Sequence, residues 1–409
     1  MSEPKFIPPE QNPLLVRVIQ SIFYLVAYFV YKIRLVIDED EVAKLKAIAD
    51  YRVVYLPNHS NLDDGFALFL LSARIGQLFN YVVALEAFRG WVGKLIQKVG
   101  AYSIRRGVGD RQSIIQTLKI LQQPRCKLVI FPEGGCSYQN DTVMPFRAGA
   151  FELSFKALDK LVNQNNNIVP DFYLVPVTLK YLYPDATDNQ IEQTLSRLET
   201  ALALTPQNRD FYQRLRQIGI KVLSNLEAEY RVLNEASTDY NHRISVLKQR
   251  MLDYCEEKLE ITPLIQLPDR ERVYKVQETV RSFSDIDNHQ PSTVNYQHIY
   301  LTTVRLLNFD AIYDGYVAEK PTTERFFDTI DRLEREVFQI DRPKFKGRRQ
   351  IIVKISAPIN LKDYWQQYQS DRQSPQNQNK LLNNHSAQNK PVIDNLAKLS
   401  RQLIQANLN

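Results

Sequence analysis

The feature that most constrains this chain is a short apolar run that ends abruptly in a cluster of polar residues. The run Val53-Val54-Tyr55-Leu56 has the length and composition of a buried strand. Pro57 ends the run in a turn, and the apolar segment 66–71 then predicts a helix that begins at one of the two preceding aspartates. A histidine, His59, therefore lies on a turn between a strand and a helix, close to two carboxylates.

This arrangement is suited to acid–base chemistry. A histidine accepts a proton near neutral pH, and a carboxylate beside it can fix its tautomer and stabilise its charged form. Helical geometry favours Asp63 as the partner of His59, because residues i and i+4 share a face. The alternative explanation is structural, since the Asn, Ser and Asp side chains of this turn can serve only local hydrogen bonds and helix capping.

Two further stretches have the composition of an anion-binding site. The apolar run 127–131 predicts a strand that leads into Glu133-Gly134-Gly135, and paired glycines let backbone N–H groups approach an anion closely. A strand-like segment also ends at Arg105 and Arg106, whose guanidinium groups can each bind a phosphate through two hydrogen bonds.

Together these stretches carry a family resemblance. Asn58-His59 with Asp64 five positions beyond the histidine, the segment 100–106, Phe131-Pro132-Glu133-Gly134-Gly135 and Val175-Pro176-Val177 follow one another in the chain. Their order and spacing resemble the four-block pattern of the glycerolipid acyltransferases, the superfamily that includes glycerol-3-phosphate and lysophosphatidate acyltransferases. The resemblance covers about residues 50–182.

The resemblance implies roles for individual residues. His59 would be the general base and Asp64, by the family's spacing, its partner, which leaves Asp63 as a helix cap or a solvent-facing residue. The residues expected to bind substrate are Arg105, Arg106, Glu133, Gly134, Gly135 and Arg147. Many family members have an arginine where this chain has Cys136, and we expect Arg147 to supply the missing contact.

The resemblance also implies a reaction and its partners. We expect transfer of a fatty acyl group from acyl-CoA or acyl-carrier protein, as co-substrate, to a hydroxyl of a phosphorylated glycerol in phospholipid synthesis. No metal and no bound cofactor are implied. Two alternatives stay open, namely transfer to another lipid alcohol or lysolipid, and a non-catalytic membrane-binding protein.

Composition narrows the possible partners. The chain of 409 residues has a formal net charge of +6, which fits an anionic membrane surface or a phosphorylated substrate. The chain has no run of basic residues interleaved with aromatic ones, so the sequence gives no indication of nucleic-acid binding. Three cysteines without paired spacing predict neither a disulfide framework nor a zinc site, and the N-terminus does not have the pattern of a signal peptide.

The N-terminal region suggests contact with a membrane. Residues 14–37 are apolar but interrupted by basic residues, and the uncharged window 18–31 is shorter than the roughly 20 residues needed to span a bilayer. We expect an amphipathic helix in the interface, on the cytoplasmic face of the membrane, although a buried core helix has the same pattern.

The expected fold class is α/β, with a mainly parallel sheet flanked by helices. We divide the chain into an N-terminal amphipathic membrane-associated segment (1–49), an acyltransferase core (50–183), a helical insertion (184–346), and a final part with a closing strand and a terminal helix (347–409). The Gln/Asn-rich residues 366–390 predict a disordered loop, and a strand is expected at 350–355.

Overall fold

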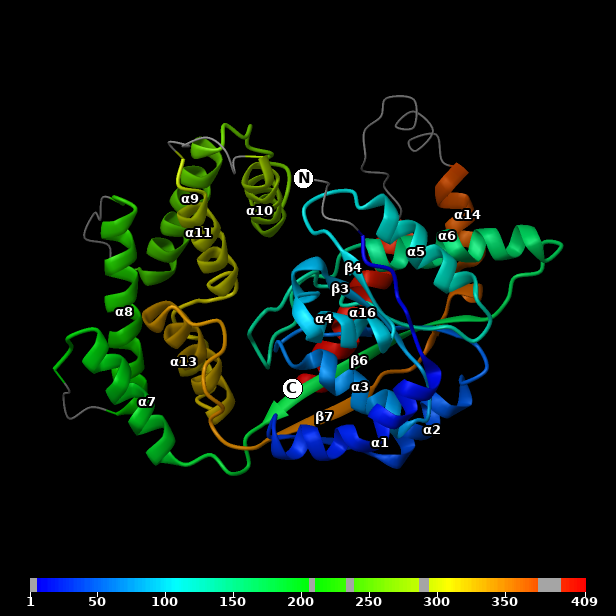
Figure 1. Ribbon diagram of the computed structural model, residues 1–409, viewed down its shortest axis with the longest axis horizontal. Coiled ribbons are helices and arrows are strands. Elements are labelled where there is room, and N and C mark those ends of the chain that lie inside the picture. Colours follow the sequence, from blue (N-terminus) through cyan, green and yellow to red (C-terminus); the bar gives the residue numbers. More distant parts are fainter. Residues whose placement is uncertain (1–5, 206–209, 233–238, 287–293, 374–390) are drawn as a thin grey trace.

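The structure is a computed structural model and describes residues 6–205, 210–232, 239–286, 294–373 and 391–409. One sheet forms its centre, with helices on both faces and a bundle of further helices to one side (Figure 1). The strands are β1 (Ile33–Ile37), β2 (Arg52–Pro57), β3 (Asn80–Ala84), β4 (Ala101–Ile104), β5 (Lys127–Val129), β6 (Phe172–Leu182), β7 (Arg349–Ile355) and β8 (Ile359–Asn360).

The sheet is mainly parallel, as the sequence predicts. Its strand order is β1-β7-β6-β2-β5-β3-β4, with β8 paired to β6. The five strands from β6 to β4 run parallel to their neighbours, whereas β7 and β8 pair with β6 in the antiparallel sense. β2 is central, so its carboxyl end, where His59 follows, lies between the ends of β6 and β5.

The helices complete a three-layer arrangement around the sheet (Figure 1). Helices α1 to α4 pack on one face, and α5, α6, α14 and α16 pack on the other. The helices are α1 (Pro13–Phe29), α2 (Glu39–Ala47), α3 (Asp64–Arg74), α4 (Gly90–Lys98), α5 (Arg111–Gln122), α6 (Gly149–Gln164), α7 (Asp188–Ala201), α8 (Phe211–Glu229), α9 (Tyr240–Lys258), α10 (Asp269–Ile286), α11 (Tyr296–Asn308), α12 (Tyr316–Glu319), α13 (Thr323–Phe338), α14 (Trp365–Gln373) and α16 (Pro391–Leu408), and two short 3₁₀ helices span Leu85–Ala87 and Leu361–Tyr364.

Strand β2 shows why an uninterrupted apolar run is needed at the centre of such a sheet. Its residues Val53 to Leu56 are completely buried, because helices cover both faces of the sheet. Alternate side chains serve opposite layers, so that Val53 and Tyr55 belong to the core on one face and Val54 and Leu56 to the core on the other.

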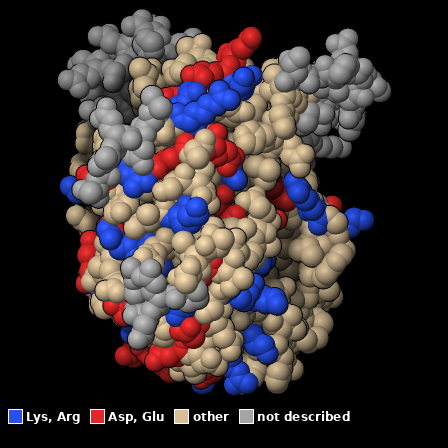
Figure 2. Space-filling model, turned by 90° about the vertical axis from the view of Figure 1, so that its left-hand side faces the viewer, with Lys and Arg blue, Asp and Glu red and all other residues tan. Residues whose placement is uncertain are grey.

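Helices α7 to α13 lie between β6 and β7 in the chain and form the separate bundle (Figure 1). The bundle has a hydrophobic core of its own, made of residues between Ile191 and Leu333. Because β6 and β7 are neighbours in the sheet, the bundle leaves and rejoins the same region of it. Its outward face carries interspersed basic and acidic side chains, with no large region of one sign (Figure 2).

The prediction of one helix over residues 14–37 is wrong at its C-terminal end. α1 stops at Phe29, Lys32 adopts a left-handed conformation with φ of 55°, and Ile33–Ile37 forms strand β1. This strand pairs in parallel with β7, the strand expected at 350–355 and found at Arg349–Ile355. The sequence could not reveal β1, because the partner that makes it a strand lies near the other end of the chain.

The C-terminal region also departs from expectation. Residues 366–373 belong to helix α14 and are not a loop, because Tyr368 is buried and stacks on Phe155 with ring centroids 4.4 Å apart. The rest of the predicted disordered loop, residues 374–390, lies outside the described residues. In the described ranges, no helix is both long enough and apolar enough to pass through a bilayer.

Candidate active site

His59 and Asp64 meet just beyond the end of β2. The Nδ1 atom of His59 lies 2.9 Å from Oδ2 of Asp64, and the imidazole ring packs against Phe131 with centroids 4.4 Å apart. The His59 side chain is 21% exposed, whereas Asp64 is fully buried at the start of α3. Within the described residues nothing hydrogen-bonds to Nε2, so a proton on Nδ1 leaves Nε2 as a free base on a partly exposed side chain.

Asp64 is held by three donors in addition to its burial. Oδ2 accepts the backbone N–H of Asn61 at 2.9 Å as well as His59, and Oδ1 accepts the hydroxyl of Tyr181 at 2.7 Å. Burial, followed by the charge of Asp64, raises the pKa of Tyr181 well above its ordinary value, so this hydroxyl keeps its proton. The carboxylate is therefore fixed in the orientation in which it faces the imidazole.

Asp63 has a different role from the one expected. It is buried, not solvent-facing, and its side chain does not cap α3. Its Oδ2 accepts Arg349 at 2.7 Å and its Oδ1 accepts Arg342 at 2.9 Å. Both arginines come from the end of the chain that re-enters the sheet at β7, so Asp63 ties the start of α3 to that strand.

Glu133 fixes the turn that carries His59. Its Oε1 accepts the backbone N–H of His59 at 2.6 Å, and its Oε2 accepts that of Met144 at 3.1 Å. Burial raises the pKa of Glu133 to about 8, and the two backbone donors and Arg270 oppose this shift. With both oxygens occupied by backbone groups, Glu133 supports the site and does not face an acceptor.

The Gly134-Gly135 turn packs tightly against helix α10. Gly134 adopts φ of 72°, and a Cβ there would lie 2.6 Å from the side chain of Arg147. A Cβ on Gly135 would lie 2.1 Å from the hydroxyl of Tyr274. The N–H of Gly134 donates to Phe131 O at 3.1 Å, so the expectation that the N–H groups of this turn are free for an anion fails for Gly134.

The three arginines singled out in the sequence lie beside α10, and two of them contact Tyr274. The guanidinium of Arg106 stacks 4.4 Å from the Tyr274 ring and donates to its hydroxyl at 3.2 Å, and Arg147 lies 5.7 Å from the same ring. Arg105 pairs with Glu278, one helical turn further along α10, at 3.5 Å. These contacts join two distant stretches of the sheet domain to one face of α10. We call Arg105, Arg106 and Arg147 the arginine cluster.

The arginine cluster already has acidic partners. Arg147 lies 3.5 Å from Glu271 of α10, and Arg106 lies 3.6 Å from Glu86. These separations exceed hydrogen-bonding distance, and the Nε of Arg106 is buried without a partner among the described residues. Because the ion pairs are long and the guanidinium groups are partly exposed, the cluster could still donate hydrogen bonds to an anion.

Helices of the bundle hold the loop that follows Gly135, and sequence reasoning missed all of these contacts. Arg270 donates to the carbonyl oxygens of Gly135 and Cys136 at 2.9 and 3.2 Å, and Arg332, completely buried, donates to Ser137 O at 2.6 Å. Asp328 accepts the backbone N–H of Asn140 at 2.9 Å. These residues form no motif near the blocks, so only the folded chain could reveal them.

The site, as far as the structure describes it, offers neither a reactive thiol nor a group of metal ligands. Burial raises the pKa of the Cys136 thiol far above its usual value, so this thiol stays protonated and is a poor nucleophile. In the part of the chain that the structure describes, no group of three or more His, Cys, Asp or Glu residues is arranged to hold a metal ion.

Comparison with protein families supplies the assignment. The family model described as Acyltransferase matches residues 37–180. Residues 37–180, which are less than half of the chain, are thus similar to the acyltransferase family. This agrees with the resemblance inferred from the four blocks and supports acyl transfer in lipid metabolism. The acyltransferase match begins at the last residue of β1 and ends within β6, so the helical bundle and β7 lie outside it.

Proposed function

We propose that this protein transfers a fatty acyl group from a thioester, acyl-CoA or acyl-carrier protein, to a hydroxyl of a phosphorylated glycerol such as lysophosphatidate or glycerol-3-phosphate. The observation that carries the proposal is the His59–Asp64 contact at 2.9 Å, with Nε2 of the histidine left unpaired within the described residues. A fixed carboxylate behind an accessible imidazole is the arrangement that general-base activation of a hydroxyl requires.

In the proposed reaction His59 Nε2 takes the proton of the acceptor hydroxyl as its oxygen attacks the thioester carbonyl. The resulting imidazolium is stabilised by Asp64, which keeps the other ring nitrogen protonated and oriented. Collapse of the tetrahedral intermediate breaks the carbon–sulfur bond, and the proton on His59 passes to the departing thiolate. Every proton and electron pair is accounted for without a covalent enzyme intermediate.

The tetrahedral intermediate carries an oxyanion that needs a donor. The N–H of Gly134 is used by Phe131, but that of Gly135 has no acceptor among the described residues. Tyr274 donates to the Gly134 carbonyl at 3.2 Å, and this carbonyl belongs to the same peptide as the Gly135 N–H, so the contact fixes the orientation of the donor. We therefore assign the backbone around Gly135 as the oxyanion donor, a role that is strongest when the donor is positioned in advance.

The arginine cluster would bind the acceptor phosphate. Arg105 and Arg147 make long ion pairs with carboxylates of α10, and Arg106 makes one with Glu86. Each of the three side chains is between a quarter and a third exposed. A phosphate oxygen can approach such guanidinium groups at shorter, hydrogen-bonded distances than the carboxylates do. Phosphate binding would thus replace long arginine–glutamate ion pairs with shorter arginine–phosphate hydrogen bonds.

A second candidate, transfer to an uncharged lipid alcohol, is favoured by the same ion pairs. Glu271, Glu278 and Glu86 lie beside the arginine cluster, although Glu278 and Glu86 also pair with Arg281, so the site is not an unpaired cationic pocket. The decisive experiment is a panel of acceptors, namely a phosphomonoester, a phosphodiester and an uncharged glycerolipid, assayed with labelled acyl-CoA and acyl-carrier protein. Turnover confined to the phosphomonoester supports the first proposal, and turnover confined to the uncharged lipid supports the second.

The arginine substitutions test the phosphate assignment directly. Arg105→Ala and Arg106→Ala should raise the KM for a phosphorylated acceptor at least tenfold each, since a charge-assisted hydrogen bond contributes on the order of 1.5–3 kcal/mol. The KM for the acyl donor should change little. An increase in the donor KM alone would show that these arginines serve the donor's phosphates.

We also propose that helix α1 attaches the protein to the cytoplasmic face of a membrane, at its surface. Its exposed apolar residues recur on one face, with Leu14, Val18, Ile22, Leu25 and Phe29 each more than half exposed. Such a stripe is suited to the interface of a lipid bilayer. Leu25→Glu should reduce sedimentation with phospholipid vesicles at least severalfold, and unchanged sedimentation would exclude this stripe as the contact.

A further inference from the structure

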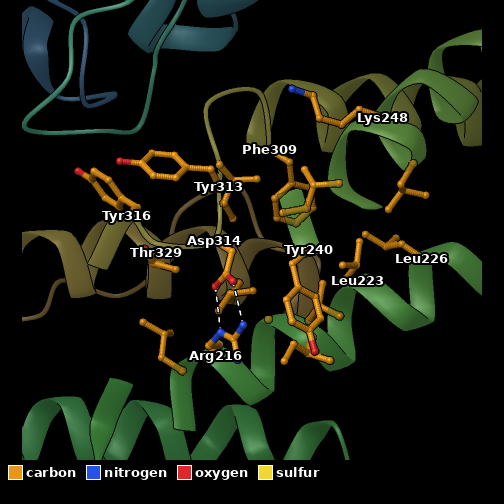
Figure 3. Close-up of a pocket in the computed structure, with 18 of the residues that line it drawn as sticks. Arg216, Leu223, Leu226, Tyr240, Lys248, Phe309, Tyr313, Asp314, Tyr316 and Thr329 are labelled. Atoms are coloured by element: carbon orange, nitrogen blue, oxygen red, sulfur yellow. Dashed lines mark hydrogen bonds and ion pairs between the residues drawn. The ribbon is translucent and has the colours of Figure 1, made fainter. Parts of the chain in front are cut away.

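The helical bundle contains a cavity that the acyl-transfer chemistry does not use (Figure 3). Its volume is about 130 Å³, and its walls come from α8, α9, α11, α13 and the segment 312–317. Side chains such as Leu223, Tyr240 and Phe309 surround it, and the ion pair of Arg216 with Asp314 lies at one side (Figure 3). Neither the His59–Asp64 pair nor the arginine cluster belongs to its lining.

The cavity interrupts a core that is otherwise well buried. Leu215, Leu223 and Met251 line it, and each is less than a tenth exposed. Protein interiors contain few voids larger than a water molecule, and an apolar void destabilises the fold in proportion to its volume. A hollow of this size in the core of the bundle is therefore a feature that requires a reason.

Gly219 keeps the cavity open. It lies in the middle of helix α8, where glycine is the least favourable residue apart from proline. It lines the cavity, and a Cβ built at this position would meet no atom within 4 Å. An alanine would therefore fit without a clash and would favour the helix, and a larger apolar side chain would extend from the same position into the cavity.

We propose that this cavity binds the hydrocarbon tail of a fatty acyl group. The lining is largely aliphatic and aromatic, which suits an apolar ligand that makes no directional contacts. Its volume is close to that of a known dry apolar cavity of about 150 Å³ that accepts benzene, so it holds the end of a chain and not a whole lipid. The acyltransferase domain defines the chemical class, because acyl chains are what such a protein handles.

The polar end of the ligand would remain outside. Arg216 donates to both carboxylate oxygens of Asp314, at 3.0 and 2.9 Å, and both side chains are partly exposed. Because the two side chains are paired with each other, neither leaves an unpaired charge in the apolar space. The tail therefore enters alone.

One wall of the cavity is also attached to the candidate active site. Ile312 to Val317 line the cavity, and the residues just before them contact the loop after Gly135. Asp310 pairs with Arg270 at 2.6 Å, and Ala311 O accepts the side chain of Gln139. A tail that orders this segment would steady the same loop that carries the proposed oxyanion donor.

The test compares two substitutions at Gly219 and needs no turnover, so it stays valid if the proposed acceptor is wrong. Gly219→Ala is the matched control, and Gly219→Phe places a ring in the cavity. The probe is cis-parinaric acid, whose conjugated hydrocarbon tail fluoresces more strongly in apolar surroundings and carries no attached dye. We expect the control to bind it like the wild type and Gly219→Phe to bind it at least tenfold more weakly or with one site fewer.

Thermal unfolding without ligand separates a filled cavity from a damaged fold. Gly219→Phe should unfold at the same temperature as the control or higher, and palmitate should raise the unfolding temperature of the control but not of Gly219→Phe. Equal parinarate binding by the two variants would overturn the proposal. Gly219→Leu is a second substitution that fills the cavity. The proposal would also be overturned if Gly219→Phe bound parinarate weakly and lost thermal stability, while Gly219→Leu stayed stable and bound parinarate normally.

Chain-length profiles then identify the source of the tail. If the tail belongs to the acyl donor, Gly219→Phe shifts the preferred donor to shorter chains, and if it belongs to the acceptor, the acceptor preference shifts instead. If binding is lost while both preferences stay fixed, the tail is that of a separate fatty acid that acts as an effector. Each result supports a tail site, provided that the binding difference between the Gly219 variants is observed.

Discussion

Asp63 and Asp64 are neighbours in the chain, but their carboxylates belong to separate networks. Asp64 faces His59 and Tyr181 beside the end of β2, whereas Asp63 pairs with Arg349 at the start of β7. The turn between His59 and Asp64 is not helical, because α3 begins only at Asp64. The i, i+4 geometry that favours Asp63 therefore does not apply, and the family's spacing predicts the observed contact.

Replacing Asp64 by Asn should abolish turnover and leave the fold intact. The amide cannot keep His59 in the required tautomer or stabilise the imidazolium, and neutralising an orienting carboxylate in a serine protease lowers kcat by about 10⁴. We expect a loss of several orders of magnitude in kcat with little change in the acceptor KM. A variant with wild-type kcat would remove Asp64 from the mechanism.

Replacing Asp63 by Asn should destabilise the protein and leave the chemistry of the folded fraction unchanged. Sequence alone predicts a weakened cap, on the order of 1 kcal/mol. The structure predicts a larger loss, about 3–5 kcal/mol in the free energy of unfolding, because Arg349 loses its buried partner.

An exposed ion pair provides the matched control for Asp63. Asp50 lies 3.2 Å from Arg125, and both side chains are at least 70% exposed, so Asp50→Asn should cost no more than about 1 kcal/mol. Urea unfolding of both variants gives the comparison. If Asp63→Asn costs as little as Asp50→Asn, the link between α3 and β7 does not stabilise the fold.

The sequence predicts the parts of this site that are local in the chain. A strand, a turn and a helix place His59 and Asp64, and the second strand with its glycines places Glu133 and Gly134. The contacts that sequence reasoning missed connect residues that are far apart. Tyr274 donates to Gly134 O across 140 positions, and no periodicity within α10 distinguishes this tyrosine from others in the chain.

The same distinction explains the errors in the fold. β1 is a strand because β7 pairs with it, and Asp63 is buried because Arg349 arrives with β7. Both depend on a strand near residue 350, which the sequence predicts without indicating its neighbours. Local patterns identify strands and helices, but the order of strands in a sheet depends on contacts between distant parts of the chain.

Glu133 should make stability depend on pH in a defined window. Burial raises its pKa from 4.5 to about 8 in the folded protein, so the folded state keeps a proton that the unfolded state has released. The free energy of unfolding should therefore fall as the pH rises from about 4.5 to about 8. Glu133→Gln lacks this titration, so the stability of the wild type relative to this variant should be greater near pH 5 than near pH 8.

Denaturant unfolding at several pH values gives the free energy of unfolding of the wild type and of Glu133→Gln. Subtracting one value from the other removes the contribution of the other titratable groups. A difference that is constant from pH 5 to pH 8 would mean that Glu133 is already ionised in the folded protein. The amide variant loses one of the two backbone hydrogen bonds at any pH, and this adds a constant offset.

Tyr274 should position the arginine cluster through both its ring and its hydroxyl. Tyr274→Phe keeps the stacking with Arg106 but loses the hydrogen bonds to Arg106 and Gly134, and Tyr274→Leu loses both kinds of contact. With a phosphorylated acceptor we expect its KM to rise severalfold for Phe and more for Leu, while the donor KM changes little. A purely structural role would instead lower stability and leave the acceptor KM unchanged in both variants.

The carboxylates of α10 should have the opposite effect from Tyr274. Glu271 and Glu278 lie 3.5 Å from Arg147 and Arg105, so an acceptor phosphate must compete with them. Each partly exposed pair contributes at most about 1 kcal/mol, so the double variant Glu271→Gln, Glu278→Gln should lower the KM for a phosphorylated acceptor by no more than about 30-fold. A phosphomonoester carries about −1.5 to −2 charges at neutral pH and competes better than a phosphodiester with a single charge. The double variant should therefore lower the KM for the phosphodiester more than that for the phosphomonoester, and so reduce the preference between the two acceptors.

The KM values for both acceptors, measured on the wild type and on the double variant, test this expectation. A KM that rises for each acceptor would mean that the two glutamates hold the arginines in place for the phosphate and do not compete with it.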